Sequence, residues 1–336
     1  MSAGNAGIFM PFVLALGYAT LLILLLGVAG QIYKKFKSRR HLDITDQWVV
    51  VTGCDSGIGQ GAVRALAKDG AKVVACCYTE TGANAALAAG ATWAPHFDLR
   101  DDDVLRDVAE QILAQSGGAL WCVVHAAGTV LPGFIDYQPI KFYRDVMAVN
   151  FFAPVLLTQK LLTALRRCRG RVIVVSSVDG IVSLPGNAPY DASKFAIEAY
   201  ADALRTELSL CGVGVSVINP ATMRTPMADA FFPGHRKTWT AMAAEEPEGD
   251  WQALWPESWL DQYVEKNTQQ LRSIAEDPAA AVNDIVHAAT AAHQKLRYLS
   301  GRLAQGPFFA LWLMPGSWSL RIKRLTGQPK PPMSSS

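Results

Sequence analysis

The sequence has little excess charge and few cysteines, and each shortage excludes a class of protein. Lys and Arg total 31 and Asp and Glu total 29 among 336 residues, so the formal net charge is only +2. A charge this small gives no reason to expect a nucleic-acid partner. The six cysteines show no C-x-x-C spacing, which argues against structural zinc or a disulfide framework. We therefore expect no metal, and reduced, buried thiols in a domain facing the cytosol.

Charged side chains are also absent from the first thirty-three residues. Residues 6–30 form an apolar run, and at about 1.5 Å per helical residue this run reaches roughly 37 Å, enough to span a hydrocarbon core of about 30 Å. A basic cluster, Lys34 to Arg40, follows it. A cleaved signal peptide is the rival interpretation, but it requires positive charge before a shorter apolar run.

The pattern therefore predicts an uncleaved, single-pass membrane anchor over residues 1–33 and a basic linker over residues 34–46. Because positive charge resists translocation, we expect the rest of the chain on the cytosolic side. In a eukaryotic cell we expect the endoplasmic reticulum, since no lumenal retention signal or mitochondrial presequence is visible.

The remaining chain alternates β-branched apolar runs with helical patterns. The expected strands cover residues 48–52, 71–77, 92–96, 120–124, 171–177, 214–219 and 296–299, and the clearest helices cover 82–89, 103–115, 141–167 and 279–295. This alternation predicts one α/β domain over residues 47–300, a doubly wound, Rossmann-type parallel sheet. Ligands of such sheets bind at the carboxyl ends of the strands.

The first expected strand leads into Gly53, Gly57 and Gly59, and an alanine-rich helix follows. Glycines let backbone N–H groups approach a pyrophosphate, and the positive end of a helix dipole favours its charge. The spacing is G-x-x-x-G-x-G, which is not the commonest dinucleotide fingerprint. An ordinary glycine-rich turn therefore remains the alternative.

Tyr190 and Lys194 stand four residues apart at the start of another expected helix, with Asn187 as its cap and Pro189 in its first turn. Residues at this spacing share a helix face. A positive charge within about 4–6 Å favours the phenolate, so we expect Lys194 to lower the pKa of Tyr190 from its usual value near 10. Tyr190 would then exchange a proton near neutral pH.

Together these motifs resemble the short-chain dehydrogenase/reductase family over about residues 48–298. The family's T-G-x-x-x-G-x-G corresponds to residues 52–59, and its Y-x-x-x-K to Tyr190 and Lys194. The resemblance implies that Tyr190 is the acid/base group, that Ser177 and Tyr190 hold the substrate oxygen, that Lys194 binds the nicotinamide ribose, and that Asn150 holds a water in a proton relay.

The resemblance also implies NAD or NADP as cofactor. The implied binding residues are Gly53, Asp55, Ser56, Gly57, Ile58, Gly59, Cys77, Asp98, Leu99, Ala126, Gly128, Asn150, Tyr190, Lys194, Pro220 and Thr225. Because no cation is placed for a 2′-phosphate, and Asp55 and Glu80 would repel one, NAD is favoured. Ala126 departs from the family's asparagine, which ties strands together, and Ala221 departs from its glycine.

Residues 223–275 form the segment in which the family recognises its substrate, and here it is rich in Phe and Trp. Two interpretations carry equal weight: a loop that covers a bulky apolar alcohol, or a surface loop with its own small core. The tail, residues 301–336, is apolar and basic and suits contact with a membrane interface.

The motifs T-G-C-D-S-G and A-C-C-Y-T-E-T-G resemble those of the membrane-bound retinol and 17β-hydroxysteroid dehydrogenase branch. We therefore expect a membrane-bound NAD(P)-dependent oxidoreductase that interconverts an alcohol and its carbonyl on a retinoid or hydroxysteroid. The alternatives are an NADPH-dependent keto-lipid or 3-hydroxy-acid reductase and a catalytically silent, membrane-tethered binding protein. The sequence leaves homo-oligomerisation open.

Overall fold

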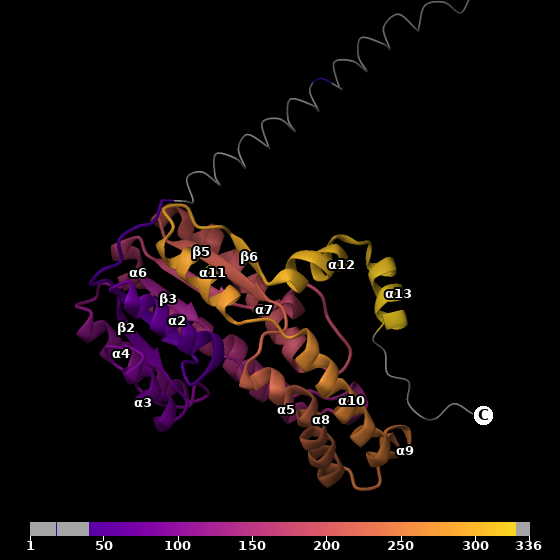
Figure 1. Cartoon of the computed structure of the whole chain (residues 1–336). Helices are drawn as coiled ribbons and strands as arrows, with labels where there is room; N and C mark the ends of the chain where they lie inside the picture. The colour runs from indigo at the N-terminus through magenta and orange to yellow at the C-terminus, as the bar shows by residue number, and fades with distance from the viewer. Residues whose placement is uncertain (1–17, 19–39, 327–336) are drawn as a thin grey trace, which may run out of the picture.

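Six parallel strands form one sheet in the order β2-β1-β3-β4-β5-β6. The computed structural model describes Tyr18 and residues 40–326 (Figure 1). The strands are β1 (Trp48–Thr52), β2 (Lys72–Cys76), β3 (Cys122–His125), β4 (Arg171–Val175), β5 (Gly214–Pro220) and β6 (Arg297–Ser300). Most strand residues are apolar, with Val the commonest, as suits a parallel sheet covered on both faces. The predicted single α/β domain with a Rossmann-type sheet is confirmed.

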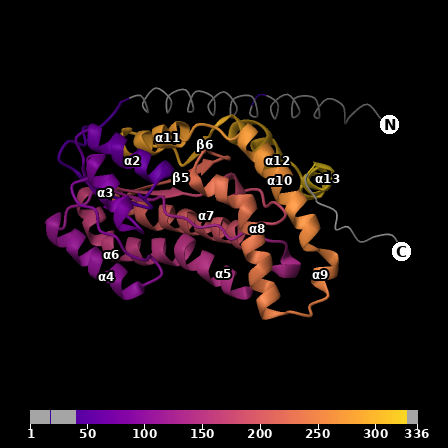
Figure 2. The ribbon, with the colours of Figure 1, turned by 60° about the horizontal axis from the view of Figure 1, so that its bottom comes forward.

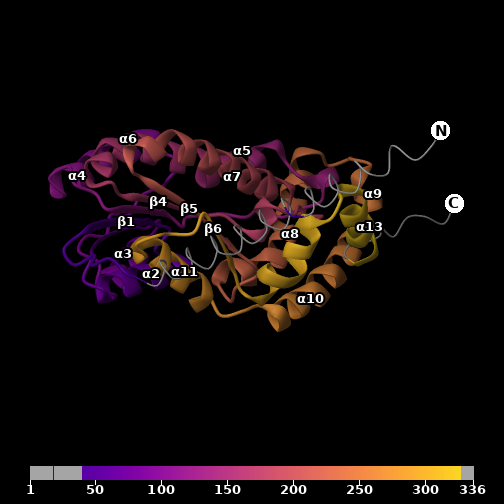
Figure 3. The same cartoon turned by 90° about the horizontal axis from the view of Figure 1, so that it is seen from above.

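Helices cover both faces of the sheet, as Figure 3 shows from above. On one side lie α2 (Gly57–Lys68), α3 (Glu80–Ala88) and α11 (Ala279–Thr290), and on the other α4 (Asp102–Gln115), α6 (Ala153–Cys168) and α7 (Ala188–Leu208). Alternate residues of β1 serve the two layers: Val49 and Val51 pack with Leu66, while Val50 joins the core around Leu157. Because successive side chains of a strand point to opposite faces of the sheet, the hydrophobic core is divided into two layers.

Capping side chains fix where two of these helices begin. Thr79 accepts a hydrogen bond from the backbone N–H of Gly82 at the start of α3. Asp101 accepts from the N–H groups of Asp103 and Val104 at the start of α4. Each cap satisfies donors that the first helical turn leaves unpaired.

The order of the strands reverses at β1, which lies between β2 and β3. Thr52 at the end of β1 pairs with Cys76 on one side and His125 on the other. Because the connections leave in opposite directions here, the carboxyl ends of β1 and β3 border a crevice, the usual ligand site of such sheets.

The helix predicted for residues 141–167 is interrupted by a π-turn. It consists of α5 (Ile140–Met147), η2 (Ala148–Phe152) and α6. In the part of the chain that the structure describes, this is the one helix whose length and composition would suit a membrane span. Its buried Leu157, Leu161 and Leu165 lie in the domain core, so here it is a core helix. The predicted anchor lies, apart from Tyr18, outside the described residues.

Two predicted elements are shorter than expected. Residues 92–96 run beside β2 but form only isolated bridges, Val74 with Trp93 and Cys77 with His96, because Pro95 has no N–H to continue a ladder. The helix predicted to reach residue 295 ends at Thr290. There Ala292 N–H donates to the carbonyl of Arg40, so pairing with the N-terminal segment replaces the next helical turn.

The segment predicted as a substrate loop, residues 223–275, is mainly helical. It contains α8 (Pro226–Glu245), α9 (Trp251–Leu254) and α10 (Glu257–Ile274), which Figure 1 shows gathered at one end of the molecule. Aromatic rings hold these helices together with η1 (Ile135–Tyr137): Phe134 stacks on Trp255 with centroids 4.4 Å apart, and Trp259 stacks on Tyr263 at 5.0 Å. We call these rings, together with Tyr137, Trp239 and Trp251, the aromatic core.

After β6 the chain forms η5 (Ala304–Phe308), α12 (Phe309–Leu313) and α13 (Gly316–Thr326). Figures 1 and 2 both place α12 and α13 at the same end of the molecule as α9 and α10. Five large apolar side chains are exposed here, namely Phe309, Trp312, Leu313, Trp318 and Leu320. We call them the C-terminal apolar face.

Candidate active site

Two connected hollows lie at the carboxyl ends of the strands. The first, the glycine-loop cleft, has a volume of about 760 Å³ and runs from Asp98 to Thr225. The second, the Tyr190 cavity, has a volume of about 440 Å³ and contains Ser177, Tyr190 and Lys194 on its wall. The two share lining residues Ile58, Ala126, Gly128, Thr225 and Met227. A ligand in the cleft would therefore meet a ligand in the cavity.

The glycines of the first cleft are required by its backbone. Gly53 has φ +72°, and a Cβ there would lie 2.5 Å from Ala127 Cα. A Cβ at Gly59 would lie 2.1 Å from the carbonyl oxygen of Gly53. Ser56, at the N-cap of α2, makes no side-chain capping bond, and the first turn of α2 contains no acid. The N–H groups at this helix end therefore remain available to an anion.

Asp55 ties the glycine loop to the end of β2. Its carboxylate accepts from the N–H of Tyr78 at 2.7 Å, the N–H of Thr79 at 2.9 Å and the Thr79 hydroxyl at 2.7 Å. Cys77 follows β2 and is buried. Both residues line the cleft, as the sequence predicted.

Arg100 bears on the prediction that no cation is placed for a 2′-phosphate, because it is a cation that lines the cleft. It lines the cleft beside Asp98 and donates from Nη2 to Asp98 Oδ2 at 2.6 Å, and this pairing holds the pKa of Asp98 below its usual value. The spacing of two residues within a loop gave no sign that this arginine would turn inward. Its charge is engaged by Asp98.

The other predicted nucleotide residues divide between the two hollows. Leu99, Ala126 and Gly128 line the cleft, Pro220 lines the cavity, and Thr225 lines both. Sequence reasoning missed Tyr78, Thr129, Lys141 and Lys237, which also line the cleft. Tyr78 lies within the A-C-C-Y-T-E-T-G motif, which supports only the family resemblance. The other three come from loops and helices without a motif, so only the fold assembles them.

Ser177, Tyr190 and Lys194 meet in the cavity from two elements. Ser177 follows β4 and caps η3 (Val178–Gly180), where its Oγ accepts from the N–H of Asp179 at 3.1 Å. Tyr190 and Lys194 lie in the first turns of α7, and Lys194 Nζ is 5.3 Å from the centre of the Tyr190 ring. Lys194 Nζ also donates to the carbonyl of Val175 at 2.9 Å. Asn187 occupies the N-cap of α7 but makes no side-chain capping bond.

Asn150 lies in the π-turn and is buried behind these residues. Its Oδ1 accepts from Thr129 N–H at 2.8 Å, and its Nδ2 donates to Thr129 O at 3.0 Å and Ser193 Oγ at 2.9 Å. Asn150 thus connects the loop after β3 with the helix that carries Tyr190. Such π-turns often occur at functional sites, and the apolar period of the sequence gave no sign of this one.

Burial dominates the electrostatics of the cavity. It raises the pKa of Tyr190, Asp179 adds to the rise, and a hydrogen bond with Ser177 opposes it. Burial lowers the pKa of Lys194 to about 8, against the effect of Glu198 and Asp179, and raises that of Asp179 to about 6. The expectation that Lys194 lowers the pKa of Tyr190 is therefore wrong for this geometry, because desolvation of the phenolate outweighs a charge 5.3 Å from the ring.

The outer wall of the cavity is mainly apolar, with Asn267 and Gln270 of α10 as its polar members. Phe231 and Phe232 of α8, Leu271 and Ile274 of α10, and Phe308 of η5 contribute to it. Both interpretations of residues 223–275 are thus partly right: the phenylalanines face the cavity, while the tryptophans form the aromatic core. The four-residue spacing of Trp251, Trp255, Trp259 and Tyr263 is a sequence signal that could have indicated helix in this segment, which was predicted as a loop.

The two departures from the family pattern are accommodated locally. Beside Ala126, Ala127 N–H donates to Thr52 Oγ1 at 3.2 Å, and His125 Nε2 lies 2.8 Å from Thr158 Oγ1. These bonds tie the end of β3 to its neighbours. Ala221 packs with Val178 and Ala304.

No cluster of three or more His, Cys, Asp or Glu side chains that could hold a metal occurs among residues 40–326. Four of the cysteines, Cys54, Cys76, Cys77 and Cys122, are buried, while Cys168 is half-buried and Cys211 exposed. The four buried thiols lie in or beside the strands and glycine loop where the sequence placed them.

Residues 47–235 match the family model described as short chain dehydrogenase. Among similar proteins, Dehydrogenase/reductase SDR family member 9 of Bos taurus is 31% identical, and the alignment covers 88% of this chain and 92% of the relative. Retinol dehydrogenase 16 of Homo sapiens is 32% identical, and 17-beta-hydroxysteroid dehydrogenase type 6 of Bos taurus is 30% identical; each alignment covers 84% of this chain and 89% of the relative.

Solved structures show the same fold. A short chain dehydrogenase/reductase from Burkholderia phymatum in complex with NAD superposes with a TM-score of 0.67 at 20% identity, covering 87% of this chain and 99% of its own. A short chain dehydrogenase from Burkholderia cenocepacia in complex with NADP gives 0.62 at 20% identity, covering 85% and 100%.

Proposed function

Because the chain belongs to the short-chain dehydrogenase/reductase family, we propose that it interconverts an apolar alcohol and its carbonyl with a nicotinamide dinucleotide. One observation carries the proposal. Ser177, Tyr190 and Lys194 line a single cavity, and that cavity shares Ile58, Gly128 and Thr225 with the glycine-loop cleft. An acid/base tyrosine and a dinucleotide site are thus contiguous.

The cleft fits the dinucleotide. The Gly53–Gly59 backbone and the uncapped start of α2 suit its pyrophosphate, Asp98 and Leu99 its adenine end, and Pro220 and Thr225 its nicotinamide end. Lys194 and Tyr190 would bind the nicotinamide ribose. When bound, the nicotinamide supplies or accepts the hydride.

Tyr190 carries the proton chemistry in this proposal. A raised pKa keeps its phenol protonated near neutral pH, so it is ready to donate to a carbonyl oxygen in reduction. In oxidation it acts as the base, and the hydrogen bond with Ser177 is the contact that favours the phenolate. Ser177 Oγ hydrogen-bonds the substrate oxygen and stabilises its developing charge. In this proposal Asn150, held by Thr129 and Ser193, would support a water relay behind Lys194.

The apolar wall of the cavity favours a bulky apolar substrate, and the similarity to retinol dehydrogenase 16 and 17-beta-hydroxysteroid dehydrogenase type 6 supports a retinoid or hydroxysteroid. We favour NAD over NADP. The carboxylates of Asp55 and Asp98 line the adenosine end of the cleft, where they would repel a 2′-phosphate, and Asp98 already pairs with Arg100. Arg100 is also the observation that keeps a second candidate, an NADPH-dependent keto-lipid or 3-hydroxy-acid reductase. Release from Asp98 would let it meet a 2′-phosphate.

The proposal includes a membrane. Residues 1–33 would anchor the chain, residues 34–46 link the anchor to a cytosolic catalytic domain over residues 47–300, and residues 301–336 rest on the endoplasmic reticulum surface. In support, residues 301–336 contain no acid but five basic residues, and the C-terminal apolar face is exposed. Phe308 lines the Tyr190 cavity and directly precedes this face, so an apolar substrate would reach the site from the bilayer.

The test is turnover by the detergent-solubilised full chain of retinol, a 17β-hydroxysteroid, a 3-hydroxy acid and a keto-lipid, each with NAD(H) and NADP(H). We expect retinol or the hydroxysteroid with NAD(H) to give the highest kcat/KM. Preference for the keto-lipid with NADPH would establish the second candidate. Nucleotide binding without turnover of any substrate would refute the enzymatic proposal.

A further inference from the structure

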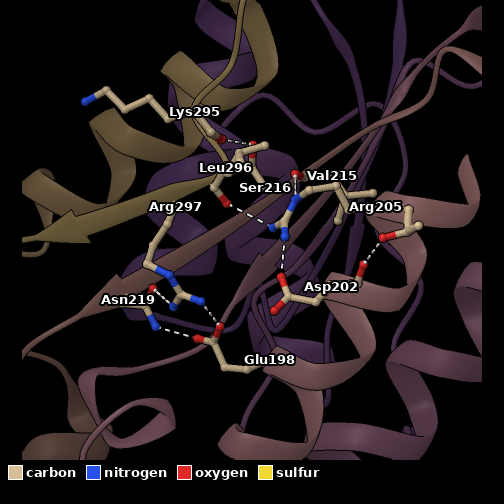
Figure 4. A network of polar contacts seen from close by, with 10 residues as sticks. Glu198, Asp202, Arg205, Val215, Ser216, Asn219, Lys295, Leu296 and Arg297 are labelled. Carbon is tan, nitrogen blue, oxygen red and sulfur yellow. Dashed lines mark hydrogen bonds and ion pairs between the residues drawn. The ribbon is translucent and has the colours of Figure 1, made fainter. Parts of the chain in front are cut away.

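A largely buried polar network lies between α7, β5 and β6 (Figure 4). Glu198 of α7 has a side chain only 9% exposed, and its Oε2 lies 2.6 Å from Arg297 Nη2 on β6. Asn219 of β5 donates to Glu198 Oε1 at 2.5 Å and accepts from Arg297 Nη1 at 2.8 Å. Each of the three side chains thus contacts the other two.

This triangle contacts the backbone of Ser177 directly and lies one helical turn from Lys194. Asn219 Nδ2 also donates to the backbone carbonyl of Ser177 at 2.8 Å. Glu198 lies four residues after Lys194, so both lie on one face of α7. A Cβ at Gly180 would lie 3.1 Å from Glu198 Cγ and 3.1 Å from the Lys194 carbonyl oxygen, which shows how closely η3 packs on this face.

We infer that Glu198, held by Arg297 and Asn219, is a positioning residue: it fixes the Ser177 backbone relative to α7 and holds a carboxylate one helical turn from Lys194. This inference rests on the proposed function. It assigns a task to an ion pair that touches neither hollow. A buried pair contributes little net stability compared with apolar packing, so a role in the site accounts better for its presence.

The charges around Lys194 predict the direction in which its pKa should change in each variant. Tyr190 and Glu198 face it from α7, Asp179 from η3 and Arg297 from β6, beyond Glu198. Burial depresses the pKa of Lys194 to about 8, and Glu198 is the largest opposing influence. Removing the carboxylate should therefore let Lys194 lose its proton at lower pH, whereas removing the Arg297 charge should do the reverse.

The experiment measures kcat and NAD affinity from pH 6 to 10 for the full chain in detergent. In Glu198→Gln the basic limb of both pH profiles should shift to lower pH by about one unit or more, the size expected for loss of a nearby opposite charge. In Arg297→Gln it should move up, and in the double variant it should return toward wild type. If Glu198→Gln does not fold, the upward shift in Arg297→Gln carries the test.

Asp202→Asn is the matched control. Asp202 pairs with Arg205 one turn further along α7, and Arg205 donates to Val215 O and Leu296 O, so this pair joins the same elements without touching Ser177 or Lys194 (Figure 4). Its profiles should match those of wild type. Equal losses at every pH in both single variants, with no opposite shifts, would make the network merely structural and overturn the inference.

Failure of the inference is distinct from failure of the proposed function. If wild type lacks NAD-dependent turnover, or Tyr190→Phe retains it, the proposed chemistry is wrong. The pH dependence of NAD affinity still tests Glu198 in that case. If wild type is active and Tyr190→Phe is not, but the two charge variants keep the wild-type limb, then only the inference fails.

Discussion

Tyr190 is subject to opposite influences: burial and Asp179 hold its proton, while Ser177 favours release. Among the described residues, two tyrosines line the cavity, Tyr190 and Tyr263. Of the two, Tyr190 is the one beside Ser177 and Lys194. A rigid wall around it means that removing the hydroxyl should change the chemistry more than the fold.

We expect Tyr190→Phe to keep the melting temperature and to weaken NAD binding far less than turnover, because Lys194 still holds the ribose, while kcat falls about 10²–10⁴-fold, the usual contribution of a positioned acid/base group. Steady-state kinetics with the best alcohol of the panel, alongside NAD titration, checks this. Tyr263→Phe is the control, because it removes a phenol from the same cavity without touching Lys194. A near wild-type kcat for Tyr190→Phe would refute the acid/base role.

His125 gives a second test at the residue scale. Burial lowers the pKa of this side chain from 6.5 to about 4. Because the folded value is depressed, the neutral imidazole stabilises the fold above pH 6.5, and this contribution is lost as pH falls toward 4. The shift corresponds to about 3 kcal/mol.

His125→Gln should therefore weaken the decline of unfolding free energy between pH 6.5 and 4, even if it is less stable at pH 7. Urea unfolding at several pH values, in detergent, measures the slope. His96→Gln is the control, since His96 stands beside the edge strand β2 and not in the core. An unchanged slope in His125→Gln would contradict the assignment.

At the scale of elements, the helices α8 to α10 depend on the aromatic core. Trp255 is buried, stacks on Phe134, and donates from Nε1 to Asp136 Oδ2 at 2.8 Å. Truncating a buried tryptophan removes transfer free energy and leaves a cavity.

Trp255→Ala should cost about 3–5 kcal/mol of unfolding free energy, or unfold α8 to α10 locally. Trp318→Ala, at a side chain 68% exposed, should change it by less than about 0.5 kcal/mol. Chemical denaturation and hydrogen exchange over residues 226–274 separate the global from the local effect. Equal, small effects of the two substitutions would mean that the aromatic core does not hold these helices.

The elements that sequence reasoning identified best are those with strong local signals. β1, the glycine loop and α2 combine a β-branched run, three glycines and an alanine-rich helix, and all lie where expected. The π-turn at Asn150 could not be predicted, because the apolar period continues through it. The Glu198–Arg297 pair joins residues 99 positions apart, so only the parallel pairing of β5 with β6 brings it together.

For the molecule as a whole, the distribution of charge predicts an orientation. The proposed anchor has no charge before it and five basic residues in 34–40, and the tail after residue 300 contains no acid. Both ends of the catalytic domain would then favour the same anionic, cytosolic leaflet.

An epitope placed after Ser336 should be digested by protease in sealed microsomes without detergent, because we expect it to face the cytosol. A lumenal marker protein must stay protected in the same sample. Full protection of the epitope would place the catalytic domain in the lumen. Replacing the basic residues of 34–40 by glutamine should reduce the fraction that is digested.

The aromatic core has a consequence for how such a protein diversifies. Its rings pack among themselves and with η1, and none of its buried members belongs to the two clusters that sandwich the sheet. Phe231 and Phe232 of α8 line the cavity and are not among the buried members of the aromatic core, although the Phe232 ring meets Tyr263 edge-on at 5.7 Å. Selection can therefore exchange these cavity-facing side chains over generations while the sheet and the proton-transfer residues stay unaltered. Substrate preference could then change in evolution while the fold and the site of proton transfer stay the same.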